Sequence, residues 1–217
     1  HINKHYVYNI DLKDFFHSFD RNWVKYGFMI KPFNLGKERE NLAFLLASLC
    51  THPFEIKDDL KIVLPQGSPT SPTITNILCL KLDKRLNGLA KRFAITYTRY
   101  ADDITFSSQT NVFIKDDFLN ELNRIITDQN LVINPTKTRL QQKAYKQEVT
   151  GLTVNEKVNV NSKYIKQLRM WLYYWERYGY LKAEQIFKRD YNTDNGHVKK
   201  GNANFQNVLM GKLDYLK

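Results

Sequence analysis

The sequence has few cysteines, no long apolar run and no internal repeat among its 217 residues. Cys50 and Cys79 are its only cysteines and stand in unrelated contexts, which does not support a disulfide framework and favours a reducing, cytoplasmic setting. No apolar segment approaches the roughly 20 residues that a membrane-spanning helix needs, so we expect no membrane partner. Low-complexity tracts are lacking as well, so the chain has room for one large packed domain, or for one domain with an appendage.

The composition that remains is that of a folded, strongly basic protein. Hydrophobic residues make up 42% of the chain and aromatic residues 13%, which is typical of a packed core and not of a disordered chain. The net charge is +11, from 33 basic and 22 acidic residues. Such an excess favours a polyanionic partner, because Lys and Arg displace counterions from phosphates. Ribosomal and membrane-surface proteins share this property, so charge alone does not identify the partner.

Apolar periodicity predicts an α+β chain. The strand-like runs are followed or separated by amphipathic segments, and strand signals become rare after Asn161. At Ser71 and Pro72 the sequence has the form of a helix N-cap followed by proline at the first helical position. We expect strands at 6–10, 62–64, 94–100, 104–107 and 131–133, helices at 41–50, 71–89 and 118–126, a small hairpin at 149–160, and a domain boundary near Asn161.

Three acidic residues stand where strands end or turn. Asp11 follows the first strand-like run, and Asp102 and Asp103 lie in the turn between the runs 94–100 and 104–107. Carboxylates that converge repel one another unless a cation lies between them. Two Mg²⁺ ions held by a few carboxylates can act on both oxygens of a phosphoryl transfer. An Asp-Asp pair is also ordinary turn chemistry, so this pattern alone leaves both interpretations open.

Five segments in a fixed order carry a resemblance to a known family. They span about 150 residues: 9–16 (NIDLKDFF), 64–72 (LPQGSPTSP) with Asn76, 100–103 (YADD), 134–138 (NPTKT) and 151–152 (GL). The series resembles reverse transcriptases of the bacterial, retron and group II intron type. This resemblance implies a palm at 1–160, with an antiparallel sheet covered by helices on one face. It implies a mainly helical, thumb-like segment at 161–217.

Two further signals point within that family to retron enzymes. Residues 149–151 (VTG) resemble the Val-Thr-Gly signature of retron reverse transcriptases. His1 stands where the histidine of their Asn-Ala-x-x-His signature would fall. The resemblance implies an RNA-directed DNA polymerase that copies a structured noncoding RNA, in a family associated with antiphage defence. A group II intron or abortive-infection enzyme is an alternative, and so is a non-catalytic scaffold that binds nucleic acid.

The resemblance assigns roles to the three acidic residues. Asp11, Asp102 and Asp103 would be catalytic and would hold two Mg²⁺ ions, for which Mn²⁺ can substitute. The carbonyl oxygen of Leu12 would be a further metal ligand. One ion would activate the primer 3′-hydroxyl, and the other would bind the triphosphate and its leaving pyrophosphate.

Other residues of the same segments would bind the nucleotide. Phe16 falls where an aromatic ring packs under the sugar and disfavours a ribose 2′-hydroxyl, although simple core packing, expected for Phe15, is the alternative. Gln66 and Gly67 would line the nucleotide pocket, where glycine permits close approach of the backbone. Lys137 would be a general acid for pyrophosphate or a phosphate contact, unless it is only a solvated surface lysine.

The C-terminal segment would grip the template–primer duplex. Basic and tyrosine side chains recur there at near-helical spacing, as grooves for nucleic acid require, although a solvated helix face would show the same spacing. Lys199, Lys200 and residues 211–215 resemble the end of a thumb. The residues expected to contact template and primer are Ser68, Lys166, Arg169, Tyr173 and Arg177.

Only ten residues precede Asp11, whereas polymerases of this type need a fingers region upstream. We therefore expect a fragment, a proteolysed core or one piece of a split protein, with weak or absent polymerisation by this chain alone. The partners implied are an RNA template, a DNA or RNA primer, deoxynucleoside triphosphates, and either a missing fingers segment or a defence effector protein.

Overall fold

A computed structural model describes residues 1–56, 59–194 and 203–216 of the chain. Contacts divide the chain into two compact units. One unit comprises His1–Thr150 and Val154–Lys157, and the other comprises Gly151–Thr153 and Val158–Lys217. Lys199 and Lys200, which resemble part of a thumb, lie outside the described residues.

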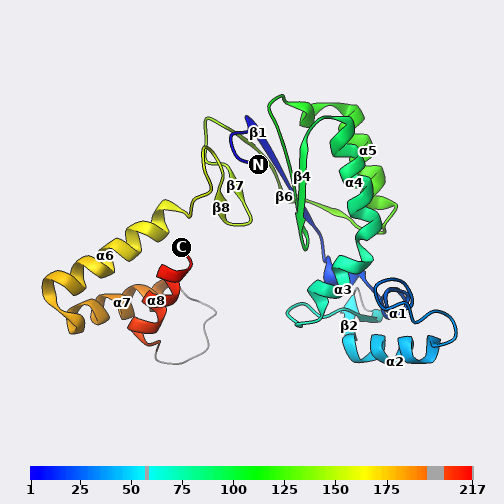
Figure 1. Ribbon diagram of the computed structural model, residues 1–217, viewed down its shortest axis with the longest axis horizontal. Coiled ribbons are helices and arrows are strands. Elements are labelled where there is room, and N and C mark those ends of the chain that lie inside the picture. The colour runs from blue at the N-terminus through cyan, green and yellow to red at the C-terminus, as the bar shows by residue number, and fades with distance from the viewer. Residues whose placement is uncertain (57–58, 195–202, 217) are drawn as a thin grey trace. The chain divides into compact units, whose positions relative to one another are not determined.

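The first unit is built on a four-stranded sheet in the order β4-β5-β1-β6 (Figure 1). Its strands are β1 (Tyr6–Leu12), β4 (Thr96–Tyr100), β5 (Asp103–Ser108) and β6 (Ile133–Gln142). Every pairing in this sheet is antiparallel. The predicted α+β fold with an antiparallel sheet is therefore confirmed.

Two amphipathic helices, α4 (Leu80–Arg92) and α5 (Asp116–Thr127), form a layer on this sheet (Figure 1). Their apolar faces share one core with buried residues of the central strands, among them Ile10, Ile104 and Phe106. Phe118 of α5 is fully buried at the centre of this layer. The helix layer therefore fixes the position of β1 and β5, the strands that carry two of the acidic residues.

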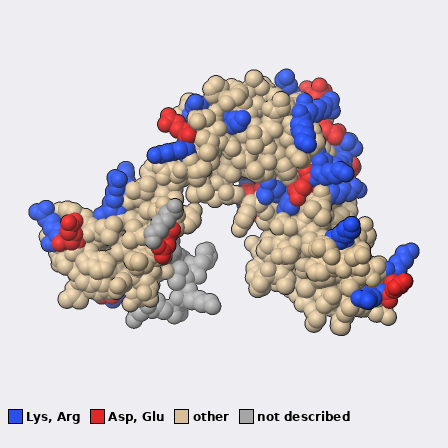
Figure 2. Space-filling view, viewed as in Figure 1, with Lys and Arg blue, Asp and Glu red and all other residues tan. Residues whose placement is uncertain are grey.

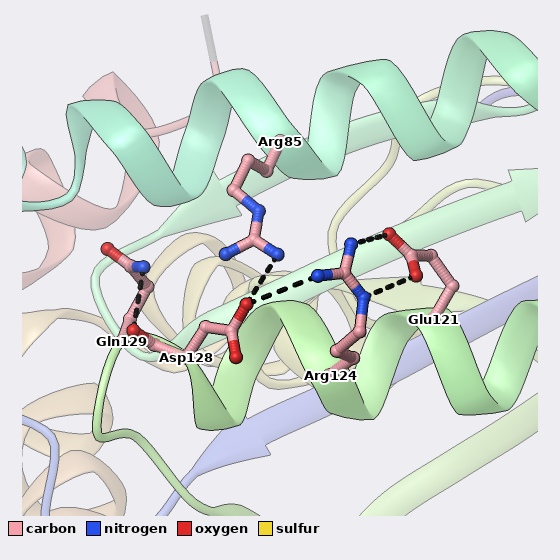
Figure 3. A network of polar contacts seen from close by, with 5 residues as sticks. All are labelled: Arg85, Glu121, Arg124, Asp128 and Gln129. Atoms are coloured by element: carbon pink, nitrogen blue, oxygen red, sulfur yellow. Dashed lines mark hydrogen bonds and ion pairs between the residues drawn. The ribbon is translucent and has the colours of Figure 1, made fainter.

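A polar network links the outer sides of α4 and α5 (Figure 3). Arg85 Nη2 of α4 donates to Asp128 Oδ2 at 2.8 Å, and Arg124 of α5 makes a second, longer contact of 3.4 Å with the same oxygen. Arg124 also forms a bidentate ion pair with the Glu121 carboxylate. Lys and Arg side chains gather over this layer in the space-filling view, with Asp and Glu among them (Figure 2). Exposed pairs of this kind contribute little to stability.

The segment between β1 and α4 contributes most of the remaining elements of the first unit. Asp20 caps α1 by accepting a hydrogen bond from the Trp23 backbone N–H at 2.9 Å. The hairpin of β2 and β3 pairs His52 with Val63. The elements are the 3₁₀ turn η1 (Phe16–Ser18), α1 (Arg21–Met29), α2 (Glu40–Cys50), β2 (His52–Ile56), β3 (Asp59–Val63) and α3 (Ser71–Leu78), and a second 3₁₀ turn, η2 (Val112–Ile114), precedes α5.

The structure corrects three details of the predicted elements. The helix predicted at 71–89 is interrupted at Cys79, whose ψ of 2° is not helical. Leu78 and Cys79 are both buried at this interruption. The N-cap of α3 is Thr70 and not Ser71. The Ser71 hydroxyl donates instead to the Pro65 carbonyl oxygen at 2.7 Å. The strand predicted at 131–133 is displaced, since β6 begins at Ile133 and runs to Gln142.

The second unit is helical. Its helices are α6 (Ser162–Tyr178), α7 (Tyr180–Asp194) and α8 (Phe205–Asp214), and the Asn161 side chain caps α6 by accepting from the Lys163 N–H at 3.0 Å. Trp171 is fully buried among aromatic neighbours in a core separate from that of the first unit. The short strand β7 (Glu148–Val149) belongs to the first unit, and β8 (Leu152–Thr153) belongs to the second. Among the described helices, none has both the length and the apolarity that crossing a membrane requires.

Candidate active site

The sheet register brings the three predicted acidic residues to one end of the first unit. Asp11 of β1 lies directly opposite Asp103 of β5 in the antiparallel pair. The Leu12 backbone N–H donates to the Asp102 carbonyl oxygen at 3.1 Å, which ties the turn before β5 to β1. Asp102 is therefore fixed beside the other two, although 91 residues separate it from Asp11 in the sequence.

The electrostatics of the site show an excess of negative charge. Burial raises the pKa of Asp103 above its usual value, and the charges of Asp102 and Asp11 raise it further against the opposing effect of Arg139 and Lys137. A raised carboxylate pKa reports unrelieved repulsion and desolvation in this cluster. A cation held between these carboxylates would relieve this repulsion.

Two neighbours on β6 engage the Asp11 carboxylate. Asn134 Nδ2 donates to Oδ2 at 3.1 Å, and Lys137 Nζ lies 3.2 Å from Oδ1. The hydrogen bond and the charge of Asp11 raise the pKa of Lys137. The Lys137 side chain is 64% exposed, whereas that of Asp11 is 13% exposed. Lys137 is thus a solvated partner of Asp11, while Asn134 orients the carboxylate through its hydrogen bond.

The donor set suits hard divalent cations, although the side chains are not arranged around one here. Within the described residues, no group of three or more His, Cys, Asp or Glu side chains is positioned to hold a metal ion. Asp11 is directed instead to Lys137 and Asn134. Three carboxylates that share one sheet end, one with a raised pKa, nevertheless have the oxygen chemistry that Mg²⁺ prefers. The residues therefore fit the predicted metal site by chemistry, and side-chain rotation has to complete it.

Two cavities flank the carboxylates. One, of about 280 Å³, is lined by Asp11, Leu12, Phe16, Gln66 and Asp102, with Lys137 and Asn134 at its side. The other, of about 350 Å³, is lined by Asp11, Asp103, Lys137, Thr136 and Arg139. Both are open to solvent and bordered by acidic and basic groups, which suits a phosphorylated ligand.

Phe16 belongs to both the cavity and the core. It lines the first cavity, but it is partly buried and packs edge-on against Phe15, with ring centroids 5.4 Å apart. Phe15 itself is buried in the core, as expected. The position therefore allows Phe16 to present one side of its ring to a ligand while the other side packs.

The loop between β3 and α3 is brought to the site only in part. Gln66 lines the first cavity, whereas neither Gly67 nor Ser68 is among the described residues that line either cavity. Gly67 has a φ of +89°, the left-handed region that glycine adopts without strain. The Ser68 hydroxyl is engaged locally with Thr70 at 3.0 Å. Close approach of the Gly67 backbone to a ligand stays a prediction.

The four predicted template–primer residues of the C-terminal segment lie on one exposed face of α6. Arg177 stacks over the ring of Tyr173 at 5.8 Å from its centroid. Buried Leu168 and Trp171 occupy the opposite side of the same helix. The exposed face comprises Lys166, Arg169, Tyr173 and Arg177.

The two retron-like signals lie on the first unit and next to it. The His1 ring is hydrogen-bonded to Ser107 at 2.7 Å and to Thr98 at 2.8 Å, and so bridges β4 and β5. Val149 is buried with Val7 and Val154. Thr150 and Gly151, which follow Val149, have φ angles of +46° and +85°.

Sequence reasoning missed several residues that the structure places around the site. Asn134 was part of a recognised segment but had no role, and Arg139 borders the second cavity. Arg99 and Asp83 form an ion pair, and Arg99 also donates to the Ala101 carbonyl oxygen in the turn before β5. The alternation of side chains along β6 could have found Arg139, because it shares a strand face with Lys137. No local signal pairs Arg99 with Asp83.

Comparisons with known proteins identify the family. A family described as reverse transcriptase (RNA-dependent DNA polymerase) matches residues 1–154. Retron Mx162 reverse transcriptase of Myxococcus xanthus is 41% identical over 171 residues, which cover 69% of this chain and 34% of that protein. Retron Ec86 reverse transcriptase of Escherichia coli is 38% identical over 172 residues, which cover 78% of this chain and 49% of that protein. Retron Mx65 reverse transcriptase of Myxococcus xanthus is 35% identical over 179 residues, which cover 80% of this chain and 42% of that protein.

The chain spans a third to a half of the length of these relatives. Among solved structures, telomerase from Candida albicans in complex with a fragment of telomeric RNA matches with a TM-score of 0.49 and 10% identity, over 99% of this chain and 45% of that one. The assignment does not depend on that match. The family match and the retron relatives confirm the resemblance predicted from the five segments, and the chain belongs to the reverse transcriptase family.

Proposed function

We propose that the protein carrying this chain is an RNA-directed DNA polymerase of the retron type, with Asp11, Asp102 and Asp103 as its catalytic residues. The observation that supports this most is the strand register, which sets Asp11 opposite Asp103 while a backbone hydrogen bond ties Asp102 to β1. A protein without a catalytic role has no need to keep three repelling carboxylates together.

Asp11, Asp102, Asp103 and the carbonyl oxygen of Leu12 are the residues that would hold two Mg²⁺ ions, or Mn²⁺ in their place. When bound, such ions activate the primer 3′-hydroxyl and neutralise charge on the triphosphate and the leaving pyrophosphate. Asn134 would keep the Asp11 carboxylate oriented through its 3.1 Å hydrogen bond.

The neighbouring side chains would bind the nucleotide. Lys137 and Arg139 border the second cavity, where they can contact phosphate oxygens; Lys137 can also protonate pyrophosphate. Phe16 would pack under the deoxyribose and exclude a 2′-hydroxyl, and Gln66 would line the same pocket. Gly67 would allow backbone approach to the nucleotide.

We further propose that residues 1–160 act as the palm and residues 161–217 as a thumb-like segment that grips the template–primer duplex. The exposed basic and aromatic face of α6 supports this role, and Ser68 is the proposed contact from the first unit. The proposed template is a structured noncoding RNA, with antiphage defence as the biological setting and an effector protein as a partner. Two free cysteines agree with a reducing, cytoplasmic location.

The retron relatives favour this type over the group II intron and abortive-infection alternatives, because each of the three most similar proteins described above is a retron enzyme. The non-catalytic scaffold is the alternative from a different class. It predicts that the acidic residues can be replaced without loss of activity in the cell.

Primer extension on an RNA template with Mg²⁺ tests the proposal in the complete protein. The double variant Asp102→Asn, Asp103→Asn is expected to lose extension while it keeps its fold. A matched control is Asp116→Asn, Asp117→Asn, which neutralises another adjacent acidic pair, exposed in the first turn of α5. The control is expected to extend as the parent does. Equal extension by the first variant and the parent would place catalysis elsewhere.

A further inference from the structure

Arg99 of β4 is almost completely buried behind the catalytic turn. Its side chain is 5% exposed and forms a two-pronged ion pair with Asp83, with Nε and Nη2 each 2.7 Å from a carboxylate oxygen. The Tyr97 hydroxyl donates to the same Asp83 carboxylate at 2.7 Å. A buried charge is costly unless it is paired and hydrogen-bonded on all sides, so this arrangement is closely specified.

Asp83 is well placed to hold the guanidinium. It lies in the first turn of α4, where the helix dipole favours a negative charge. Tyr97 lies on the same strand face as Arg99 and packs against buried Phe106, with ring centroids 5.2 Å apart. The ion pair therefore rests on an element, α4, that is itself anchored in the core.

The remaining donors of Arg99 reach beyond the ion pair. Nη1 donates to the Ala101 carbonyl oxygen at 3.0 Å, and Nη2 lies 3.3 Å from the side-chain oxygen of Asn76 in α3. Ala101 has a φ of +50°, in the left-handed region that residues with a Cβ seldom adopt. Backbone strain of this kind persists only where the surroundings hold it.

The turn is consequently held through both of its central carbonyls. Ala101 oxygen accepts from Arg99, and Asp102 oxygen accepts from the Leu12 backbone N–H at 3.1 Å. These two hydrogen bonds fix the peptide planes on either side of the Asp102 side chain. A purely structural arginine could satisfy its charge with Asp83 and need not reach the turn.

We infer that Arg99, clamped by Asp83, is a positioning residue that fixes the turn of Asp102 and Asp103 and couples it to α3 through Asn76. This inference rests on the proposed catalytic role of the two aspartates. The loop that precedes α3 carries Gln66, which lines the cavity beside Asp11. Arg99 thus joins the turn that bears the acidic residues to the helix that follows the proposed nucleotide-binding loop.

Kinetics of the complete protein test the inference with Arg99→Lys and Asp83→Asn. Arg99→Lys keeps the charge but loses the planar guanidinium that donates to Asp83 and to the Ala101 carbonyl oxygen at the same time. Asp83→Asn keeps the shape of the side chain but loses the negative charge that holds the guanidinium. We expect kcat for primer extension to fall about tenfold to a hundredfold, since small displacements of reacting groups have effects of this size. The KM for the nucleotide is expected to change little in both variants. The thermal midpoint is expected to change little in Arg99→Lys, which keeps both charges, and to fall in Asp83→Asn, which leaves the buried guanidinium without its counter-charge.

Hydrogen exchange supplies a readout that a merely structural role would not give. Amide exchange is expected to accelerate in peptides covering 96–104 and not in the rest of the sheet. The matched control is Arg85→Lys with Asp128→Asn, an ion pair of 2.8 Å that links α4 to the end of α5 without touching the turn (Figure 3). This control is expected to leave kcat and exchange in 96–104 unchanged.

Two results would overturn the inference. One is a kcat within about twofold of the parent in both variants, a change too small for lost positioning. The other is a uniform rise in exchange over the whole sheet of Arg99→Lys together with a lower thermal midpoint of that variant, which would make Arg99 a core residue only. If Arg99→Lys fails to fold, Tyr97→Phe takes its place, because it removes one hydrogen bond to Asp83. An unchanged kcat and unchanged amide exchange in 96–104 of Tyr97→Phe would then reject the inference.

The inference and the proposed function fail differently. If the parent extends primer and Asp102→Asn does not, while Arg99→Lys behaves as the parent, only the positioning role is rejected. If Asp102→Asn extends primer as the parent does, the catalytic assignment itself is wrong.

Discussion

Asp103 is the residue where the requirements of stability and of the proposed chemistry conflict most clearly. It is partly buried beside two further carboxylates, and its pKa is raised first by that burial and then by their charges. Lys137 and Arg139 relieve this repulsion only in part. Active sites commonly retain such unfavourable groups because the reaction needs them.

Replacing Asp103 by Asn is therefore expected to stabilise the metal-free protein and to abolish extension. Removal of a partly solvent-screened repulsion should raise the thermal midpoint by about 2 °C in a chain of this size. Added Mg²⁺ should raise the midpoint of the parent more than that of the variant, because a ligand stabilises the state that binds it. Calorimetry with and without Mg²⁺ checks both statements. A variant less stable than the parent in metal-free buffer would contradict them.

Phe16 offers a second test at this scale. Replacing it by Ala removes the ring expected to exclude a ribose 2′-hydroxyl, so use of ribonucleotides relative to deoxynucleotides should rise about tenfold or more in kcat/KM. Phe19→Leu is the control, because Phe19 is buried nearby without lining the cavity and should affect stability without changing this ratio. An unchanged ratio in Phe16→Ala would leave Phe16 as a core residue.

The sequence predicted where the acidic residues lie but not what holds them. Asp11 and the Asp102–Asp103 turn could be placed because each adjoins a recognisable strand. The ion pair of Arg99 with Asp83 joins a strand to a helix, and the contact of Lys137 with Asp11 spans 126 positions. Such partners depend on register and packing between distant segments, which a single sequence does not encode in any local pattern.

Among the elements, α5 depends on one buried aromatic residue. Phe118 is fully buried and contacts the rings of Tyr8, Phe93, Phe106 and Phe113. Its position joins the helix layer to the sheet that carries β1 and β5.

Phe118→Ala is expected to lower the free energy of unfolding by about 3–5 kcal/mol, the range for a large aromatic residue truncated in a core. Phe118→Leu should cost less because it fills more of the space. Denaturant titration measures both, with Ile114→Ala as the control, since Ile114 is 67% exposed. Similar losses for Phe118→Ala and Ile114→Ala would show that α5 is not anchored through this residue.

Elements with strong periodicity were predicted well, and the errors have physical causes. The helix predicted at 118–126 matches α5 because its apolar residues form one buried face. The helix predicted at 41–50 matches α2, although only Ala43 and Ala47 of α2 are buried. β6 begins later than predicted and runs through Pro135, a residue type that lacks the backbone N–H a strand ladder uses. Proline is tolerated there because β6 is the edge strand, a position that only the assembled sheet reveals.

At the scale of the whole molecule, each of the two units has a core of its own. The core of the first unit and the cluster around Trp171 share no residue. The order of the five recognised segments was enough to predict the family and the antiparallel sheet. The division between units follows from contacts and could be approached from sequence only as a change in composition near Asn161.

Trp171→Ala is expected to loosen the second unit alone. Hydrogen exchange should accelerate in α6, α7 and α8, while amides of β1 and β5 keep their protection, because local stability follows local packing. Phe118→Ala serves as the reciprocal control. Equal loss of protection throughout the described residues would mean that the chain unfolds as one cooperative unit.

The most direct test of the whole account is to locate the divalent ions. Crystals of the complete protein with an RNA template, a primer that lacks its 3′-hydroxyl, a deoxynucleoside triphosphate and Mn²⁺ would give an anomalous difference map. The account predicts two peaks within about 2.5 Å of carboxylate oxygens that include those of Asp11 and Asp102, with Lys137 released from Asp11. Peaks at other residues, or a map without peaks in which Lys137 still pairs with Asp11, would contradict it.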